Sequence, residues 1–291
     1  MHNRLTHSLE VSCVGRSLGN DVASRLLQKH PELADSHISE IGSIVSAACL
    51  AHDLGNPPFG HSGEKAISTY FSEGKGIGLK EELSSIEWDD LIHFEGNANA
   101  FRLLTHQFEG RRKGGFVMTY STLASIVKYP FSSRLAEKKS KFGFFLSEEA
   151  DFQKIATELG ITRLSQEGEP LRYARHPLVY LVEAADDICY QMMDIEDAHK
   201  LKLLTHAETK ELYSLFFDDK RKQRIEEICR IVTDVNEQIA YLRSSVIGAL
   251  IKECTRVFVE HEEEILSGEF EGSLITHIGS PLKEAYQHCS E

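Results

Sequence analysis

Apolar residues recur three or four positions apart over residues 5–27, which is the spacing of one face of an α-helix. The pattern is interrupted at Gly19-Asn20 and stops at Pro31. A second run, residues 38–54, is apolar on nearly all sides, as expected for a helix that its neighbours bury. Gly55-Asn56-Pro57-Pro58 ends this run, because two consecutive prolines remove backbone donors and clash with the preceding turn.

Helical spacing continues through the rest of the chain, whereas strand-like runs are sparse. We expect a helix to restart at His61 and to run to about Phe71, followed by a Gly-rich mobile loop over 73–78. Segments 111–118 and 142–146 form either a small hairpin or loops. Together these elements predict an all-α helical bundle with little or no β structure. Further helices are expected at 96–108, 119–129, 148–158, 176–202, 207–217, 222–252 and 254–266.

The composition is that of an ordinary folded protein, with 41% hydrophobic and 26% charged residues among 291. We predict a core over residues 1–205 and a helical extension over 206–291 that packs on it.

The formal net charge is −13, so a polyanionic ligand needs a local cluster of positive charge or a metal ion. Bulk binding of nucleic acid is therefore not expected.

The longest apolar run, residues 41–51, is too short to cross a bilayer, which takes about 20 residues. The first seven residues lack the apolar run of a secretory signal. The six cysteines include no C-x-x-C pair, so we expect reduced side chains rather than a disulfide framework or a zinc ribbon. These features predict a cytoplasmic location without a membrane partner.

His52 and Asp53 close the buried second helix, where both side chains must find partners. A divalent cation would satisfy them, with a neutral imidazole and an ionised carboxylate as its ligands. The alternative is a hydrogen-bonded pair that caps the helix. His7, on the first predicted helix, could supply a second imidazole.

A helical face farther along the chain carries Asp186, Tyr190 and Asp194, spaced i, i+4 and i+8. Asp187 points about 100° away from this face, so the spacing selects Asp186 as the candidate ligand. Tyr190 could stack on a sugar or a base, and Asp194 could accept a hydrogen bond from a ribose hydroxyl. The alternative is a half-buried core tyrosine and a solvated helix charge.

His61 and Glu64 stand at i and i+3, so they share one face of the helix that restarts there. They could form a hydrogen bond or act on one substrate. Alternatively, Glu64 completes a helix cap. The segment 128–142 carries a local excess of positive charge that could hold a triphosphate, although a basic loop is often simply solvated.

Five segments taken together resemble the bacterial dGTP triphosphohydrolases, a branch of the HD superfamily. The resemblance extends from residue 1 to about residue 285 and is far more specific than the His-Asp pair alone. The segments are Asn-Arg-Leu-Thr-His7, Ala-His52-Asp53-Leu-Gly-Asn-Pro-Pro-Phe-Gly-His61-Ser-Gly-Glu64, His93-Phe-Glu-Gly-Asn-Ala, Thr119 to Pro130, and Leu181-Val-Glu-Ala-Ala-Asp186-Asp187-Ile-Cys-Tyr190.

The resemblance assigns roles to the candidate residues. It implies one divalent metal ion, Mg²⁺ or Mn²⁺, with four ligands: His7, His52, Asp53 and Asp186. Catalytic roles fall to His61, Glu64 and His93, although His93 could also be a loop histidine with satisfied hydrogen bonds. Substrate contacts are expected from Lys128, Tyr129, Lys141, Tyr190 and Asp194.

The implied reaction is hydrolysis of a deoxynucleoside triphosphate, dGTP favoured, to the deoxynucleoside and inorganic triphosphate. The alternatives are another HD-superfamily nucleotidase or phosphodiesterase, and a catalytically silent regulatory member. The family pattern also implies a homo-oligomer and an effector that is a nucleotide or single-stranded DNA. Family members have further residues before Asn3 and beyond Pro281, so we expect this chain to be truncated at both ends relative to them.

Overall fold

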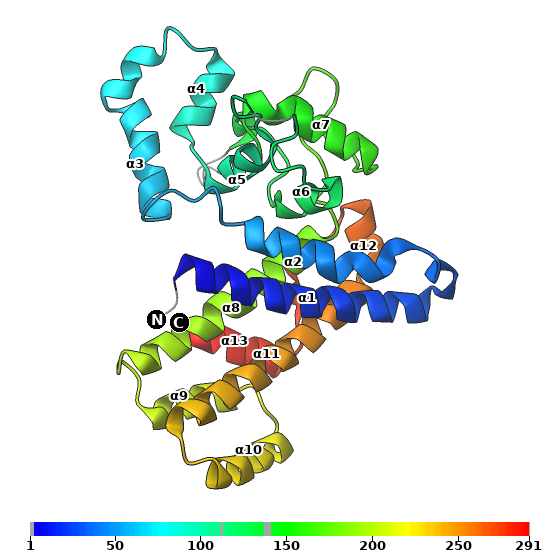
Figure 1. Cartoon of the computed structure of the whole chain (residues 1–291), viewed down its shortest axis with the longest axis vertical. Coiled ribbons are helices and arrows are strands. Elements are labelled where there is room, and N and C mark those ends of the chain that lie inside the picture. The colour runs from blue at the N-terminus through cyan, green and yellow to red at the C-terminus, as the bar shows by residue number, and fades with distance from the viewer. Residues whose placement is uncertain (1–2, 111–112, 137–140, 291) are drawn as a thin grey trace. The chain divides into compact units, whose positions relative to one another are not determined.

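The computed structural model describes residues 3–110, 113–136 and 141–290. Within these ranges it contains thirteen α-helices, six 3₁₀-helices and three isolated β-bridges, and no β-strand (Figure 1). The predicted all-α fold is confirmed. In the described residues, segment 142–146 does not pair with 111–118, because its bridge joins Phe144 to Ser132.

The helices fall into two compact units, each assembled from segments that are far apart in sequence. The first unit contains the residues up to 46, 180–262 and those from 271 onward. The predicted division into a core over 1–205 and an extension over 206–291 stays a prediction. The helices of this unit are α1 (Arg4–Lys29), the beginning of α2 (Ile41–Ala51), α8 (Val179–Lys200), α9 (His206–Ser214), α10 (Asp219–Ile231), α11 (Val235–Glu260) and α13 (Leu282–Ser290).

Helices α1 and α11 are the longest in the described chain and pack against one another in the first unit, where α11 crosses α1 (Figure 1). Of the apolar residues spaced at helical intervals on α1, Val14, Leu18 and Leu26 are buried, whereas Leu5 and Leu9 near its start are exposed. On α11 the buried face repeats every four residues, at Leu242, Val246 and Leu250. Helix α9 packs against the same α11, so α11 forms the centre of this unit.

Helix α1 runs without a break through Gly19-Asn20, where the apolar pattern is interrupted. Gly19 faces Gly42 at the start of α2, and a Cβ atom at Gly19 would lie 2.6 Å from the Cα of Gly42. The glycine therefore allows two helix backbones to approach closely and does not end the helix.

The prediction of a single helix over 222–252 is wrong, because the chain forms two helices there. Helix α10 ends at Ile231, and Asp234 caps α11 by accepting a hydrogen bond from the backbone N–H of Glu237. The side-chain amide of Gln238 donates to the carbonyl oxygens of Cys229 and Val232, which satisfies the C-terminal end of α10. Helix α11 then continues through the break expected after residue 252.

The second unit contains residues 47–179 and 263–270. Its core is aromatic: the ring of Phe152 stacks on Phe144 with centroids 4.7 Å apart and meets Phe101 and Tyr173 edge to face. Of its helices, only α4 was not expected. The helices are α3 (His61–Ser72), α4 (Ser85–Ile92), α5 (Gly96–Thr105), α6 (Tyr120–Ile126), α7 (Glu149–Glu158) and α12 (Glu262–Ser267), the last beginning one residue before the unit.

Short 3₁₀-helices connect several of these elements. One of them occupies Lys75–Leu79, where a Gly-rich mobile loop was expected. The others are Pro31–Leu33, His37–Glu40, Ser133–Leu135, Leu146–Glu148 and Leu274–His277.

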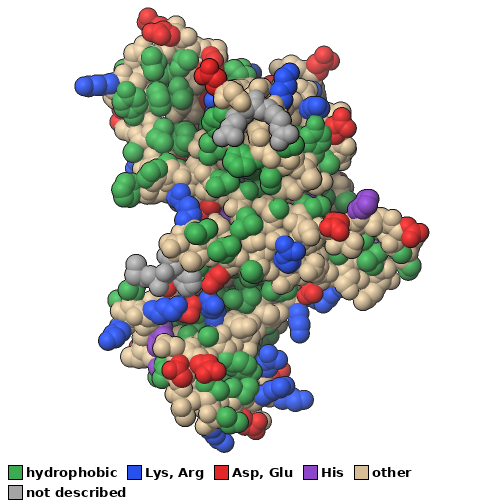
Figure 2. Space-filling view, viewed as in Figure 1, with side chains coloured by type: hydrophobic (Ala, Val, Ile, Leu, Met, Phe, Trp, Pro, Cys, Tyr) green, Lys and Arg blue, Asp and Glu red, His purple; other side chains and the backbone are tan. Residues whose placement is uncertain are grey.

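Helix α3 begins and ends close to the predicted bounds but buries none of its residues. Hydrophobic side chains gather on the surface over α3 and α4 (Figure 2), and half or more of the Tyr70 and Ile77 side chains is exposed. Helix α3 packs on α4 and on the 3₁₀-helix Lys75–Leu79. None of the described helices is long and apolar enough to span a bilayer.

Candidate functional site

His7 lies in the first turn of α1, and its ring faces Asp186 on α8. His7 Nε2 and Asp186 Oδ1 are 2.9 Å apart, although 179 positions separate the two residues in the sequence. Asn3 and Thr6 form a capping box that fixes the start of α1, so the backbone of His7 is held firmly. The exposed fraction is 16% for the His7 side chain and 39% for Asp186, so a small ligand can reach both from solvent.

His52 directly follows α2, and a backbone contact orients its ring. His52 Nδ1 lies 2.7 Å from the carbonyl oxygen of Cys49. A carbonyl oxygen can only accept, so Nδ1 carries the proton and Nε2 carries the lone pair when the imidazole is neutral. Histidines that bind metals are commonly oriented by this arrangement.

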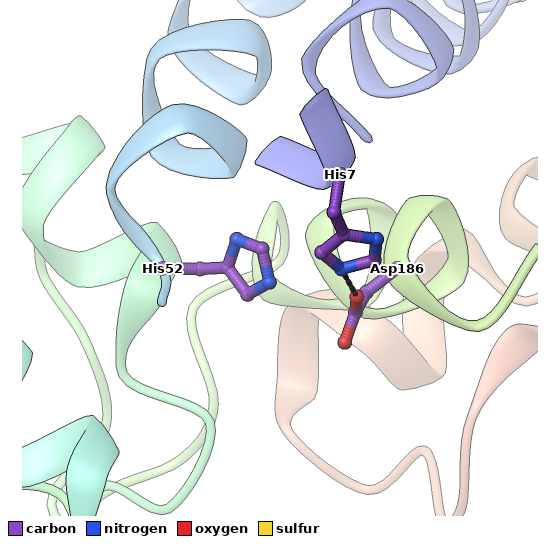
Figure 3. A group of neighbouring side chains, drawn as sticks. All are labelled: His7, His52 and Asp186. Atoms are coloured by element: carbon purple, nitrogen blue, oxygen red, sulfur yellow. Dashed lines mark hydrogen bonds and ion pairs between the residues drawn. The ribbon is translucent and has the colours of Figure 1, made fainter. Parts of the chain in front are cut away.

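The ligand atoms of His7, His52 and Asp186 all lie within 4.8 Å of one another. Figure 3 shows the three side chains directed toward a common point, with the His7 ring over the Asp186 carboxylate. Two imidazoles and one carboxylate suit several first-row divalent cations and leave room for oxygen ligands from water or a phosphate. The chemistry of the donor set therefore fits a catalytic divalent metal.

Asp53, the fourth predicted ligand, does not belong to this group of three. Its Oδ1 lies 3.5 Å from His52 Nε2 and accepts a hydrogen bond from Asn56 Nδ2 at 2.7 Å. The role of Asp53 as a ligand stays a prediction. On α8, it is Asp186 and not Asp187 that faces His7, as the helical face indicated.

His61 and Glu64 form the hydrogen bond that their spacing predicted. His61 Nδ1 and Glu64 Oε2 are 2.8 Å apart, with 87% of the histidine side chain exposed and only 12% of the glutamate. The N-cap position of α3, Gly60, receives no side-chain hydrogen bond, so Glu64 does not complete a capping box. Instead, Glu64 Oε1 accepts the backbone N–H of Gly96 at 2.8 Å.

Glu95 and Lys141 complete the surroundings of Glu64. Lys141 Nζ lies 2.7 Å from Glu95 Oε1 and 3.8 Å from Glu64 Oε2. We call His61, Glu64, Glu95 and Lys141 the α5 cluster, because Glu95 caps α5. Glu95 was missed by the sequence reasoning, although a Glu before Gly-Asn at a helix start is a recognisable capping signal.

Two pKa values in the α5 cluster are shifted. Burial raises the pKa of Glu64, but the hydrogen bonds from His61 and Gly96 and the charge of Lys141 outweigh it, and the pKa lies below its usual value. Burial lowers the pKa of Lys141, but the hydrogen bond and the charge of Glu95 outweigh it and raise the pKa. Both groups are therefore charged at neutral pH.

The loop after His52-Asp53 packs on the same helix start that holds Glu64. A Cβ atom at Gly55 would lie 2.1 Å from the carbonyl oxygen of Gly96, so only glycine fits there. Asn99 Nδ2 donates to the carbonyl oxygen of Gly55 at 2.8 Å. The first turn of α5 thus supports both the metal-ligand segment and the His61-Glu64 pair.

The other predicted site residues are not gathered into either group. His93 ends α4, and its Nδ1 lies 3.1 Å from the carbonyl oxygen of Asp89. Lys128 Nζ lies 5.8 Å from the ring centroid of Tyr129. Tyr190 and Asp194 are exposed on α8, and residues 137–140 of the basic segment lie outside the described residues. The roles of these residues stay predictions.

Histidine and aspartate side chains from separate helices thus form a candidate metal centre in an all-helical protein. This combination is typical of the His/Asp metal-binding class of domains. Comparison with known families matches the HD domain over residues 4–266, and the chain belongs to the HD-domain family. The family expected from the sequence motifs is thereby confirmed.

Curated relatives cover nearly the whole chain. A deoxyguanosinetriphosphate triphosphohydrolase-like protein of Pseudomonas aeruginosa is 44% identical over 297 residues, which are 99% of this chain and 65% of the relative. A protein of the same name from Synechocystis is 38% identical over 98% of this chain and 65% of the relative. A deoxyguanosinetriphosphate triphosphohydrolase of Yersinia enterocolitica is 30% identical over 94% of this chain and 61% of the relative. The chain thus spans somewhat less than two thirds of the length of these relatives.

Proposed function

We propose that this chain catalyses the metal-dependent hydrolysis of deoxynucleoside triphosphates, with dGTP favoured, to the deoxynucleoside and inorganic triphosphate. The observation that carries the proposal is the group formed by His7, His52 and Asp186 in an HD-domain chain. The names of its relatives support the choice of substrate.

The residues that would hold the divalent ion are His7, His52 and Asp186, with Asp53 as a fourth ligand. When held there, the ion would lower the pKa of a coordinated water toward neutrality, and would so make a hydroxide nucleophile available at neutral pH. The hydrogen bond from His52 Nδ1 to Cys49 supports this role, because it presents Nε2 as the ligand atom.

His61 is the proposed proton donor to the leaving 5′-oxygen. Its Nδ1 is held by Glu64, which leaves Nε2 of the imidazolium as the donating atom. General acid catalysis of this kind contributes about 10²- to 10⁴-fold to the rate. His93 is the second candidate for the same role.

Substrate contacts follow from the charges and the exposed faces around these residues. Lys128, Tyr129 and Lys141 would bind the phosphates and neutralise charge on the departing triphosphate. Tyr190, one helical turn from Asp186 and 63% exposed, would stack on the sugar or base, and Asp194 would accept a hydrogen bond from the sugar.

The deciding experiment incubates the chain with each dNTP and Mn²⁺ or Mg²⁺ and identifies the phosphate product by ion-exchange chromatography. We expect inorganic triphosphate and the deoxynucleoside. Orthophosphate or pyrophosphate would instead indicate another HD-superfamily nucleotidase or phosphodiesterase. Absence of turnover with every dNTP and both metals would indicate a catalytically silent member.

The role of His61 has its own test. We expect His61→Ala to lower kcat by about 10²- to 10⁴-fold, because the leaving oxygen loses its proton donor. Bound metal, measured by elemental analysis, should stay at the wild-type level, since His61 is not a proposed ligand. A variant with near wild-type turnover would remove His61 from the mechanism.

Assembly and regulation are proposed on the family resemblance alone. We expect a homo-oligomer and activation or inhibition by a nucleotide or single-stranded DNA. Light scattering after size-exclusion chromatography measures the first, and dNTP turnover with and without each added effector measures the second.

A further inference from the structure

Glu95 is the most buried carboxylate of the α5 cluster, with 1% of its surface exposed. Its Oε2 accepts the backbone N–H groups of Asn97 and Ala98 at 2.6 and 3.2 Å, which fixes the carboxylate on the first turn of α5. Its Oε1 accepts from Lys141 Nζ at 2.7 Å and from Asn97 Nδ2 at 2.8 Å. The carboxylate is therefore a rigid anchor for the Lys141 ammonium.

The anchored ammonium stands close to an oxygen that His61 uses. Lys141 Nζ lies 3.8 Å from Glu64 Oε2, and the same Oε2 lies 2.8 Å from His61 Nδ1. An ammonium moved about 1 Å closer would form a charge-assisted hydrogen bond with Oε2, the same oxygen that accepts from His61. Lys141 is thus a potential competitor of His61 for Glu64.

At its present distance the ammonium helps rather than competes. Within the described residues, the charged side chains that face Glu64 are His61 on α3 and Lys141, and Gly96 adds a backbone N–H from α5. The positive charge near Glu64 favours the ionised carboxylate that His61 needs as its acceptor. The position of the Lys141 ammonium relative to Glu64 Oε2 therefore decides whether the ammonium supports or displaces the hydrogen bond from His61.

We propose that Glu95 is a positioning residue for His61, a role that rests on the proposed function of His61 as proton donor. Glu95 holds the Lys141 ammonium near Glu64 but off its Oε2. Glu64 then stays ionised and keeps its hydrogen bond to His61 Nδ1. Glu95 acts through two other side chains and needs no contact with the substrate.

Glu95→Gln tests the proposal with little change in shape. The amide oxygen can still accept a backbone N–H of α5, but the lost charge releases Lys141 toward Glu64. We expect kcat for dNTP hydrolysis to fall about 10-fold, because His61 loses its orientation.

The decisive measurement repeats Glu95→Gln in a Lys141→Met background, where no ammonium is left to compete. There we expect Glu95→Gln to change kcat less than two-fold relative to Lys141→Met alone, so the two substitutions are strongly coupled. An equal fall in both backgrounds would overturn the proposal, because Glu95 would then act independently of Lys141. A Lys141 that Glu95 positioned only for the departing triphosphate would give the same coupling in kcat, so the ring of His61 is observed directly as well.

A second readout needs no turnover. In protein with ¹⁵N-labelled histidine, the ring signals of His61, assigned with His61→Gln, report which nitrogen carries the proton. For the neutral ring we expect the Nδ1–H form in the wild type, because an ionised carboxylate only accepts. Glu95→Gln should shift His61 toward the Nε2–H form, and it should not do so in the Lys141→Met background.

The two readouts separate the two proposals. If no dNTP is hydrolysed but the His61 signals respond as expected, the proposed function fails and the positioning role stands. If Glu95→Gln leaves the His61 signals unchanged, the positioning role is overturned whatever the turnover.

The matched control is Glu148→Gln in the same unit. Glu148 is 3% exposed and its Oε1 lies 2.7 Å from Arg102 Nη1, so it is a buried carboxylate with a cationic partner, as Glu95 is. We expect this variant to leave the His61 signals at their wild-type positions. The same shift in the control would mean that the signals report a general loosening of the unit, which would also overturn the proposal.

Discussion

Asp90 on α4 is a carboxylate held where an ionised group is unfavourable. Its side chain is buried, and its Oδ2 accepts the backbone N–H of Leu146 at 2.8 Å. Burial, with smaller contributions from the charges of Glu148 and Asp89, raises the pKa of Asp90 to about 6. The folded protein therefore binds a proton that the unfolded chain releases at a lower pH.

The sign of the pH effect follows from this difference. Between about pH 4 and pH 6 the folded state holds more protons than the unfolded state, so the free energy of unfolding falls as the pH rises. The full penalty is present above pH 6 and is absent below pH 4. The rise of the pKa of Asp90 to about 6 corresponds to roughly 3 kcal/mol as an upper bound.

We therefore expect Asp90→Asn to raise the free energy of unfolding by about 1–3 kcal/mol at pH 8 and by much less at pH 4. The asparagine oxygen can still accept from Leu146, so the hydrogen bond is kept. Urea unfolding at the two pH values measures the difference. An equal change at both pH values would contradict the role of Asp90.

Two pairs of side chains show which contacts of a site can be predicted from the sequence. The hydrogen bond between His61 and Glu64 was predictable, because a spacing of three residues places both on one helical face. The pair of Glu95 and Lys141 was not, because 46 residues separate them and only the packing of α5 brings them together. Local geometry is encoded in spacing, whereas the partner of a charged side chain is set by tertiary contacts.

Among the elements, the contact between α1 and α2 depends on two glycines. A Cβ atom at Gly19 would lie 2.6 Å from Gly42 Cα and 2.9 Å from its backbone nitrogen, both closer than real Cβ contacts. Backbone atoms cannot move aside as a flexible side chain can, so the helices would have to separate. Gly248 in the middle of α11 differs, because a Cβ atom there meets nothing within 4 Å.

We expect opposite effects from the same substitution at these two positions. Gly19→Ala should lower the free energy of unfolding by about 1–3 kcal/mol, as overpacking does. Gly248→Ala should raise it by up to about 1 kcal/mol, because alanine is the better helix former. Urea unfolding of both variants tests this, and a stabilised Gly19→Ala would show that the two helices do not approach as closely as described.

The differences between the expected and the observed helix ends have a common cause. The break between α10 and α11 has a signal in the sequence, because Asp234 and Glu237 have the spacing of a helix N-terminus. It was overlooked because apolar periodicity continues across it. Conversely, Gly19-Asn20 interrupts the apolar pattern without ending the helix, because Gly19 serves the packing of α1 on α2. Periodicity predicts that a segment is helical, but the ends depend on single residues whose role only the neighbouring element reveals.

At the scale of the whole molecule, the sequence predicted the all-α class but not which helices pack together. Helix α1 packs against α11, more than 200 positions later in the chain, and no local pattern specifies that pairing. The candidate ligands could still be proposed, because the motifs that carry them are recognisable segment by segment. Their meeting, however, is a property of the folded chain alone.

Because the candidate ligands meet only in the folded chain, the free energy of unfolding provides a test of the metal site. His7 and Asp186 are 179 positions apart, so the unfolded chain cannot offer them together, and an ion that binds them stabilises only the folded state. At a free metal concentration of about 100 times Kd the gain is about 2.7 kcal/mol, which corresponds to a rise in Tm of several degrees. We expect Mn²⁺ to produce this rise in the wild type and in Asp187→Asn but not in Asp186→Asn, as measured by differential scanning calorimetry. Because Asp187 is the adjacent residue on the same helix, a rise that vanishes in Asp187→Asn but persists in Asp186→Asn would move the ligand to the other face of α8.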